Sequence, residues 1–175
     1  MAPSYQTTNL EDVFRVRDAT PDDASACAAI YAPYVAGTTV SFEEEPPGPE
    51  EMAHRIAASQ AEHAWLVAED ADGVLGYAYA GTFRSRAAYR HTCEVSVYVD
   101  ADRRGRGVGR ALYTALLDRM TGLGMRLAVG GATMPNEASE RLHRALGFEV
   151  VGTFRDVGFK QDRWCDVRWF QKRLV

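Results

Sequence analysis

The spacing of apolar and polar positions changes near residue 100. Residues 94–99 alternate between polar and apolar side chains, with valine at every second position, which is the period-two pattern of a strand. From residue 111 the apolar side chains recur at the three- and four-residue spacing of one helical face, which predicts a helix over 107–121. A strand is therefore expected to lead through a turn at 104–109 into a helix.

The remaining pattern predicts further elements on both sides of this unit. Pro33 is expected to kink the first helix or to split off its last turn. Strands that alternate with helices, together with a hairpin turn, predict an α/β fold with a mixed sheet. No linker or repeat divides the sequence, so one domain is expected over residues 1–175, with 1–11 as a disordered extension. Strands are expected at residues 13–17, 65–68, 74–80, 126–129, 148–154 and 164–174, and helices at 20–37, 50–61 and 136–147.

Composition narrows the class of protein. The chain has 175 residues and a formal net charge of -4, so no basic excess indicates nucleic acid as a partner. Its apolar runs are shorter than the roughly 20 residues that cross a bilayer, and no signal peptide is visible, so we expect a cytoplasmic protein with no membrane partner. Cysteine and histidine lack the spacing of metal ligands, and no metal is expected. The predicted buried free thiols are Cys27, Cys93 and Cys165.

The turn between the central strand and helix carries candidate chemistry. Gly105, Gly107 and Gly109 let the backbone approach a ligand closely, and the first N–H groups of a helix have no internal partner. The helix dipole and the neighbouring arginines favour phosphate at this turn. It lacks the ending of a nucleoside-triphosphate loop and the glycine spacing of a dinucleotide fold. For Gly-x-Gly alone, a solvated turn with surface arginines is an equal alternative.

Together with its flanks, the turn resembles a known family. The pattern Arg104-x-x-Gly107-x-Gly109 after a Val-Tyr-Val strand is similar to the acetyl-CoA pyrophosphate loop of the GNAT acetyltransferases. Other segments resemble the branch of that family that acts on phosphinothricin and on methionine sulfone or sulfoximine. They are residues 39–42, 81–89, 94–99, 136–148 and 158–164.

The resemblance implies a fold and a reaction. The implied GNAT fold is a mostly antiparallel, twisted sheet flanked by about four helices, with two central strands that splay at a bulge where the cofactor enters. Acetyl-CoA is implied as the acyl donor and a small amino-acid-like amine as the acceptor, with direct attack in a ternary complex. The family is usually dimeric, so a homodimer is expected.

One group of residues is expected to bind acetyl-CoA. The glycine turn is expected to hold the pyrophosphate, and the pantetheine arm is expected to follow the preceding strand. Asn136 is expected to cap its helix, and the resemblance also implies contact with the arm. The expected cofactor residues are Val97, Tyr98, Val99, Arg104, Gly105, Arg106, Gly107, Val108, Gly109, Arg110 and Asn136.

A second group is expected to bind and activate the amine. A protonated amine must lose a proton to a base, and the resemblance implies Glu94 for this role. Without the resemblance, a structural carboxylate paired to Arg84, Arg86 or Arg90 is the stronger interpretation. The guanidinium fork of Arg84 or Arg86 suits a substrate carboxylate or phosphinate, although the branch often has lysine at position 84. Phe42 is either a wall of the pocket or a core side chain. The expected substrate residues are Phe42, Arg84, Ser85, Arg86, Tyr89, Glu94, Val95 and Ser96.

His143 stands seven residues after Asn136, where most GNAT members have a tyrosine that protonates the leaving thiolate. His143 is therefore expected to be catalytic, either giving that proton or touching the substrate. A solvent-facing histidine is the alternative, and water is the other source of the proton. The aromatic residues of 158–164 either cover the pocket or form a subunit contact.

Two other functions fit the same residues. A peptide or protein N-terminal acetyltransferase shares the cofactor loop but needs an open groove. A non-catalytic acyl-CoA-binding sensor has no use for Glu94. No cysteine or serine has the spacing of a nucleophile with its base, which favours direct transfer.

Overall fold

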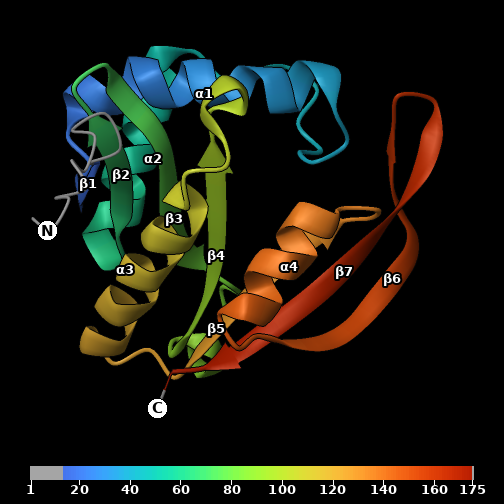
Figure 1. Ribbon diagram of the computed structural model, residues 1–175. Coiled ribbons are helices and arrows are strands. Elements are labelled where there is room, and N and C mark those ends of the chain that lie inside the picture. Colours follow the sequence, from blue (N-terminus) through green and yellow to red (C-terminus); the bar gives the residue numbers. More distant parts are fainter. Residues whose placement is uncertain (1–13, 175) are drawn as a thin grey trace, which may run out of the picture.

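The computed structural model describes residues 14–174, so the expected extension at 1–11 and the first expected strand residue, Val13, lie outside the described residues. The described strands are β1 (Arg15–Asp18), β2 (Trp65–Asp70), β3 (Gly73–Thr82), β4 (Thr92–Val99), β5 (Leu127–Thr133), β6 (Glu149–Lys160) and β7 (Arg163–Arg173). They form one sheet in the order β1-β2-β3-β4-β5-β7-β6 (Figure 1). Only β4 and β5 pair in parallel among these strands. The predicted mixed, mostly antiparallel sheet is confirmed.

Helices cover both faces of this sheet. The α-helices of the described chain are α1 (Ala24–Gly37), α2 (Pro49–Glu62), α3 (Val108–Gly122) and α4 (Glu137–Ala145). Because successive strand residues point to opposite faces, Leu66 of β2 packs in the core beneath α3, whereas Trp65 packs in the core beneath α1 and α2. In Figure 1, α3 lies in front of the sheet and α2 behind it. Among the described residues, no helix is both long enough and apolar enough to cross a membrane.

The two central strands separate after a short parallel pairing. Thr92 to Glu94 of β4 pair with Leu127 to Val129 of β5, and the strands then diverge towards the α1 end of the sheet (Figure 1). The pairing of β4 with β3 keeps one register from Cys93 to Val99, and β5 keeps one register with β7. The expected splay is therefore present, but the expected bulge at the splay is wrong.

The first helix and β6 are among the elements that differ in extent from the sequence expectation. The helix expected at 20–37 begins as a 3₁₀ turn, Pro21–Asp23, and continues as α1 through Pro33 without losing its last turn. Buried residues on both sides of Pro33, Tyr31 and Val35, hold that turn against the sheet although proline removes one helix hydrogen bond. β6 runs past residue 154 because its end, Gly158 to Lys160, pairs again with β7 after an irregular stretch.

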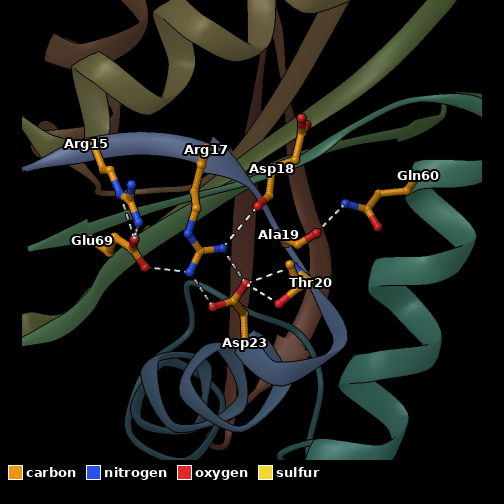
Figure 2. A network of polar contacts seen from close by, with 8 residues as sticks. All are labelled: Arg15, Arg17, Asp18, Ala19, Thr20, Asp23, Gln60 and Glu69. Atoms are coloured by element: carbon orange, nitrogen blue, oxygen red, sulfur yellow. Dashed lines mark hydrogen bonds and ion pairs between the residues drawn. The ribbon is translucent and has the colours of Figure 1, made fainter.

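A polar network ties β1 to the start of α1 (Figure 2). Arg17 donates to both carboxylate oxygens of Asp23 at 2.7 and 2.9 Å, and to Glu69 of β2 at 2.5 Å. Asp23 also accepts the Thr20 N–H at 2.7 Å. The bonds from Arg17 hold the pKa of the buried Asp23 below its ordinary value. Arg17 and then Arg15 lower the pKa of Glu69 to about 2.

Candidate active site

A cleft of about 720 Å³ opens where β4 and β5 separate. Its walls are the unpaired part of β4, the glycine turn, the first turn of α3, the facing residues of β5 and one side of α4. The end of α1 and the loop after it close another side. The expected cofactor residues that line the cleft are Val97, Tyr98, Val99, Arg104, Gly105, Gly107, Val108, Gly109, Arg110 and Asn136.

The glycine turn needs glycine for its backbone. Gly105 and Gly107 have φ angles of 87° and 77°, in the left-handed region that other residues rarely adopt. A Cβ atom at either position would meet no atom within 4 Å, so conformation and not crowding sets the requirement. Gly107 precedes α3, and its carbonyl accepts the Ala111 N–H at 3.0 Å. The N–H groups of the first turn have no earlier helix carbonyl to bind, which suits an anion.

The arginines around the turn bind two different partners, the Tyr34 hydroxyl and the Asp70 carboxylate. Arg104 donates to the Tyr34 hydroxyl at 3.0 Å at the cleft. Arg106 and Arg103 instead bind the buried carboxylate of Asp70, with closest distances of 2.7 Å, and lower its pKa to about 2. The Arg106 guanidinium therefore binds Asp70 and does not line the cleft, and the expected contact of Arg106 with the cofactor stays a prediction.

The free edge of β4 faces the cleft with backbone groups. The Tyr113 hydroxyl donates to the Val95 carbonyl at 3.2 Å, and the Tyr34 hydroxyl donates to the Val99 carbonyl at 2.5 Å. Alternate residues of a strand present their backbone groups to the same edge, so Val97 faces the cleft between these two. Past Glu94 this edge is not paired with β5. It can therefore bind an extended polar ligand by strand-like hydrogen bonds.

One side of α4 brings Asn136, Ser139 and His143 to the cleft. The Asn136 side chain accepts the Ser139 N–H at 3.1 Å and caps the helix as predicted. His143 is 3% exposed and stacks on Phe170 with 4.4 Å between ring centroids, so the solvent-facing alternative is wrong. Positions 136, 139 and 143 follow the three- and four-residue helical spacing, which is the sequence signal that could have indicated this face.

The imidazole of His143 has a defined tautomer. Its Nδ1 lies 2.8 Å from the Ser139 carbonyl oxygen, which can only accept, so Nδ1 carries the proton. Nε2 is then a bare acceptor, buried and without a hydrogen-bond partner among the described residues. It points towards Gly130, where a Cβ atom would lie 2.8 Å away. Burial lowers the pKa of His143 and favours this neutral form.

Glu94 lies on β4 with its side chain half-buried. It pairs across the sheet with Gly81, which has no side chain, and a Cβ atom there would meet nothing within 4 Å. No hydrogen bond or ion pair joins Glu94 to another described residue, so the alternative of a structural ion pair with Arg84, Arg86 or Arg90 is wrong. Burial raises the pKa of Glu94, and the charge of Arg84 partly offsets that rise. Such a carboxylate is suited to accept a proton.

The expected substrate residues are only partly gathered around the cleft. Val95 and Ser96 line it, whereas Arg84, Ser85, Arg86 and Tyr89 are exposed in the loop between β3 and β4. The Arg84 guanidinium lies 4.6 Å from the Phe83 ring centroid, and Tyr89 meets the same ring edge-on at 5.8 Å. The loop leads directly into the β4 segment that carries Glu94.

Phe42 lies outside both the core and the cleft. It is 42% exposed, so the core alternative is wrong. Its ring covers Gly158 of β6, where an added Cβ atom would lie 2.3 Å from the ring. Its neighbours Thr38 and Val40 do line the cleft. The loop that carries Phe42 thus lies between the cleft and the β6–β7 hairpin.

Several cleft residues had no assigned role in the sequence. Tyr34 and Tyr113 each donate a hydrogen bond to a backbone carbonyl of β4. The helical spacing placed Tyr113 on α3, but only the position of α3 against the splayed strand shows its hydroxyl contact. Tyr34 reaches β4 across 65 residues of sequence, so no local pattern could indicate it.

A sheet with splayed central strands, a glycine turn feeding a helix, and a cleft between them define an acetyltransferase of the GNAT type. Residues 16–169 match the family model described as an acetyltransferase (GNAT) domain, and the chain belongs to this family.

Relatives narrow the resemblance further. The chain is 44% identical over 161 residues to a phosphinothricin N-acetyltransferase of Alcaligenes faecalis, covering 91% of this chain and 82% of that protein. It is 40% identical over 164 residues to an L-methionine sulfoximine/L-methionine sulfone acetyltransferase of Pseudomonas paraeruginosa, covering 91% and 94%. The structure of a phosphinothricin acetyltransferase from Sinorhizobium meliloti in complex with AcCoA superposes with a TM-score of 0.88 at 39% identity, covering 91% of this chain and 88% of that one.

Proposed function

We propose that this protein transfers the acetyl group of acetyl-CoA to the free amine of a small amino-acid-like substrate. Phosphinothricin, methionine sulfone and methionine sulfoximine are the proposed acceptors, in line with the names of relatives about 40% identical. The observation that carries the proposal is the half-buried, unpaired Glu94 on the same strand whose free edge lines the cleft.

The cleft fits acetyl-CoA. The glycine turn and the start of α3 would hold the pyrophosphate with backbone N–H groups, and exposed Arg104 and Arg110 add positive charge there. The free edge of β4 at Val97 would bind the pantetheine arm of acetyl-CoA, and Asn136 would contact the same arm from the start of α4. Acetyl-CoA supplies a thioester whose carbonyl carbon is open to attack by an amine. Bound in this way, acetyl-CoA would already be oriented for attack. The entropy cost of orienting two reactants is a large part of the barrier in a two-substrate reaction.

Glu94 is proposed as the base that takes the proton from the acceptor amine, directly or through water. Its raised pKa makes its conjugate acid less strong and so makes the carboxylate a better base. The open space above Gly81, its cross-strand partner, leaves room for a ligand beside the carboxylate.

His143 is proposed to act through Nε2 as a hydrogen-bond acceptor at the point where β4 and β5 begin to separate. With Nδ1–H bound to the Ser139 carbonyl, the neutral ring has no proton to give at Nε2. We therefore propose that water protonates the departing thiolate and that His143 positions the reacting groups. A protonated ring is disfavoured, because burial lowers the pKa of His143.

Recognition of the acceptor is proposed to come from the two loops near Glu94. The guanidinium groups of Arg84 and Arg86 suit a carboxylate or a phosphinate, and Tyr89 and Phe42 offer partly exposed aromatic surface. Ser96, on the same face of β4 as Glu94, would complete the site.

The proposal includes one domain over 1–175, a homodimer and a cytoplasmic location. The single described sheet supports one domain, and three buried free thiols suit a reducing compartment. The edge strand β6 and its hairpin with β7 expose a band of large apolar side chains, which favours contact with a second copy. The band comprises Val150, Val151, Phe154, Val157, Phe159 and Trp164.

An amine panel assayed with acetyl-CoA tests the proposal by following thiol release. We expect turnover of phosphinothricin, methionine sulfone or methionine sulfoximine, and none of peptides with free N-termini. Turnover of peptides alone would identify an N-terminal acetyltransferase. Binding of acetyl-CoA without turnover of any amine would identify a sensor.

A further inference from the structure

Lys160 is a buried lysine at the end of β6. It is 8% exposed, and its ammonium donates to the Val35 carbonyl at 2.6 Å and to the Ser41 carbonyl at 2.7 Å. A buried ammonium is costly unless its protons are bound, so these two carbonyls hold it in place. Val35 belongs to the last turn of α1, where the helix dipole favours a cation. Lys160 thus joins the end of α1 to the loop that follows it.

The same hairpin meets this loop at two further points. The Phe42 ring covers Gly158, two residues before Lys160. On the other strand, Arg163 donates to the Thr39 hydroxyl at 3.3 Å. Three contacts from residues 158–163 therefore hold residues 39–42.

The held loop is also a wall of the cleft. Thr38 and Val40 line the cleft, and the buried Ser41 hydroxyl lies 2.6 Å from the Tyr31 hydroxyl. The Tyr31 ring meets Tyr98 of β4 edge-on, with 4.8 Å between centroids. The position of the loop is therefore coupled to the strand that carries Glu94.

We propose that Lys160 is a positioning residue for acetyl transfer, whose two backbone hydrogen bonds fix residues 38–43 against the cleft. The kinetic part of this inference rests on the proposed function, whereas its structural part does not. Lys160 touches neither the cleft nor Glu94, and it acts by holding the loop.

Replacing Lys160 by Met removes the ammonium and keeps the length of the side chain. We expect the KM for the amine to rise about tenfold while kcat, per active site, changes less than about threefold, because Glu94 and the glycine turn are untouched. Amide hydrogen exchange at residues 38–43 should quicken by about tenfold or more, because the loop opens more often. A loss of folded protein alone would lower the active fraction and would not raise KM.

Lys172→Met is the matched control. Its ammonium also donates to a backbone carbonyl, that of Leu146 at 2.6 Å, but it lies far along β7 from the loop. We expect the control to leave KM and the exchange at 38–43 unchanged. The proposal is overturned if Lys160→Met leaves that exchange at the wild-type rate, or if Lys172→Met quickens it equally.

A second pair of variants keeps the test open if Lys160→Met does not fold. Gly158→Ala places a Cβ atom against Phe42, whereas Gly152→Ala on the same strand meets nothing within 4 Å. Quicker exchange at 38–43 in the first alone supports the proposal, and equal exchange in both overturns it. Because exchange needs no substrate, a wild-type protein that acetylates no amine would refute the proposed function and still leave Lys160 tested.

Discussion

The two sides of β4 are built in different ways. The proposed cofactor side is formed mainly by one continuous stretch of chain, which comprises the strand edge, the glycine turn and the start of α3. The proposed acceptor side comprises Glu94, the loop before β4, the β6–β7 hairpin and the loop after α1, which also lines the cleft. The first side depends on backbone conformation, and the second on contacts between distant segments. A variant on one side should therefore change the KM for one substrate and leave the KM for the other unchanged.

The largest expected effect is on the acceptor side, from Glu94→Gln. Loss of the proposed base should lower kcat about 100-fold, because general-base catalysis contributes on that order. The wild-type rate should fall at acid pH with a midpoint above the ordinary glutamate value of 4.5, since burial raises the pKa of Glu94. Rates measured across pH check both effects, and Glu94→Gln should lose this acid limb. Acetyl-CoA affinity, measured by calorimetry, should stay unchanged, and a parallel loss of affinity would contradict the separation of the two sides.

Arg84→Gln should give the next largest effect on the same side. We expect the KM for the amine to rise about tenfold, because the proposed charge-assisted contact of Arg84 with the substrate anion is lost. The acid limb should also move to higher pH, since the Arg84 charge lowers the pKa of Glu94. Arg90→Gln is the control, because Arg90 lies at the other end of the same loop and binds the Ala87 carbonyl at 3.1 Å. An unchanged amine KM in Arg84→Gln would remove this arginine from the acceptor site.

Gly107→Ala probes the cofactor side with a smaller effect. The left-handed φ of 77° costs a residue with a Cβ atom about 1 kcal/mol or more, so the turn should shift and the KM for acetyl-CoA should rise about fivefold. The amine KM should stay the same. Gly122→Ala, at the other end of α3, has no positive φ and open space around it, and should change neither KM. A rise in amine KM instead would show that the turn shapes both sides.

The same contrast explains what the sequence could predict. The strand, glycine turn and helix were predicted because period and glycine spacing are local signals, and the GNAT fold with its splayed strands is confirmed. The bond from Arg106 to Asp70 could not be predicted, because Asp70 lies in another hairpin. Lys160 and Phe42 belong to contacts across more than 100 residues, which no periodicity encodes. The bulge was implied by resemblance alone, and the continuous register of β4 with β3 shows that this chain splays without one.

A change remote from both sides should alter stability and leave both KM values as they are. Asp23→Asn keeps the size of the side chain but removes the charge that binds Arg17 at 2.7 Å, so the free energy of unfolding should fall by about 2 kcal/mol. The folded state lowers the pKa of Asp23 below its ordinary 3.8, so this stabilisation is present above that value and is lost as pH falls through the folded pKa. Urea unfolding at about pH 7 and about pH 3 should therefore show a gap between wild type and variant that narrows at the lower pH. A gap that widened in acid would mean that Asp23 is not held as a carboxylate by Arg17. A shift in either KM would mean that the β1 network reaches β4, and the two sides could not then be treated as separately built.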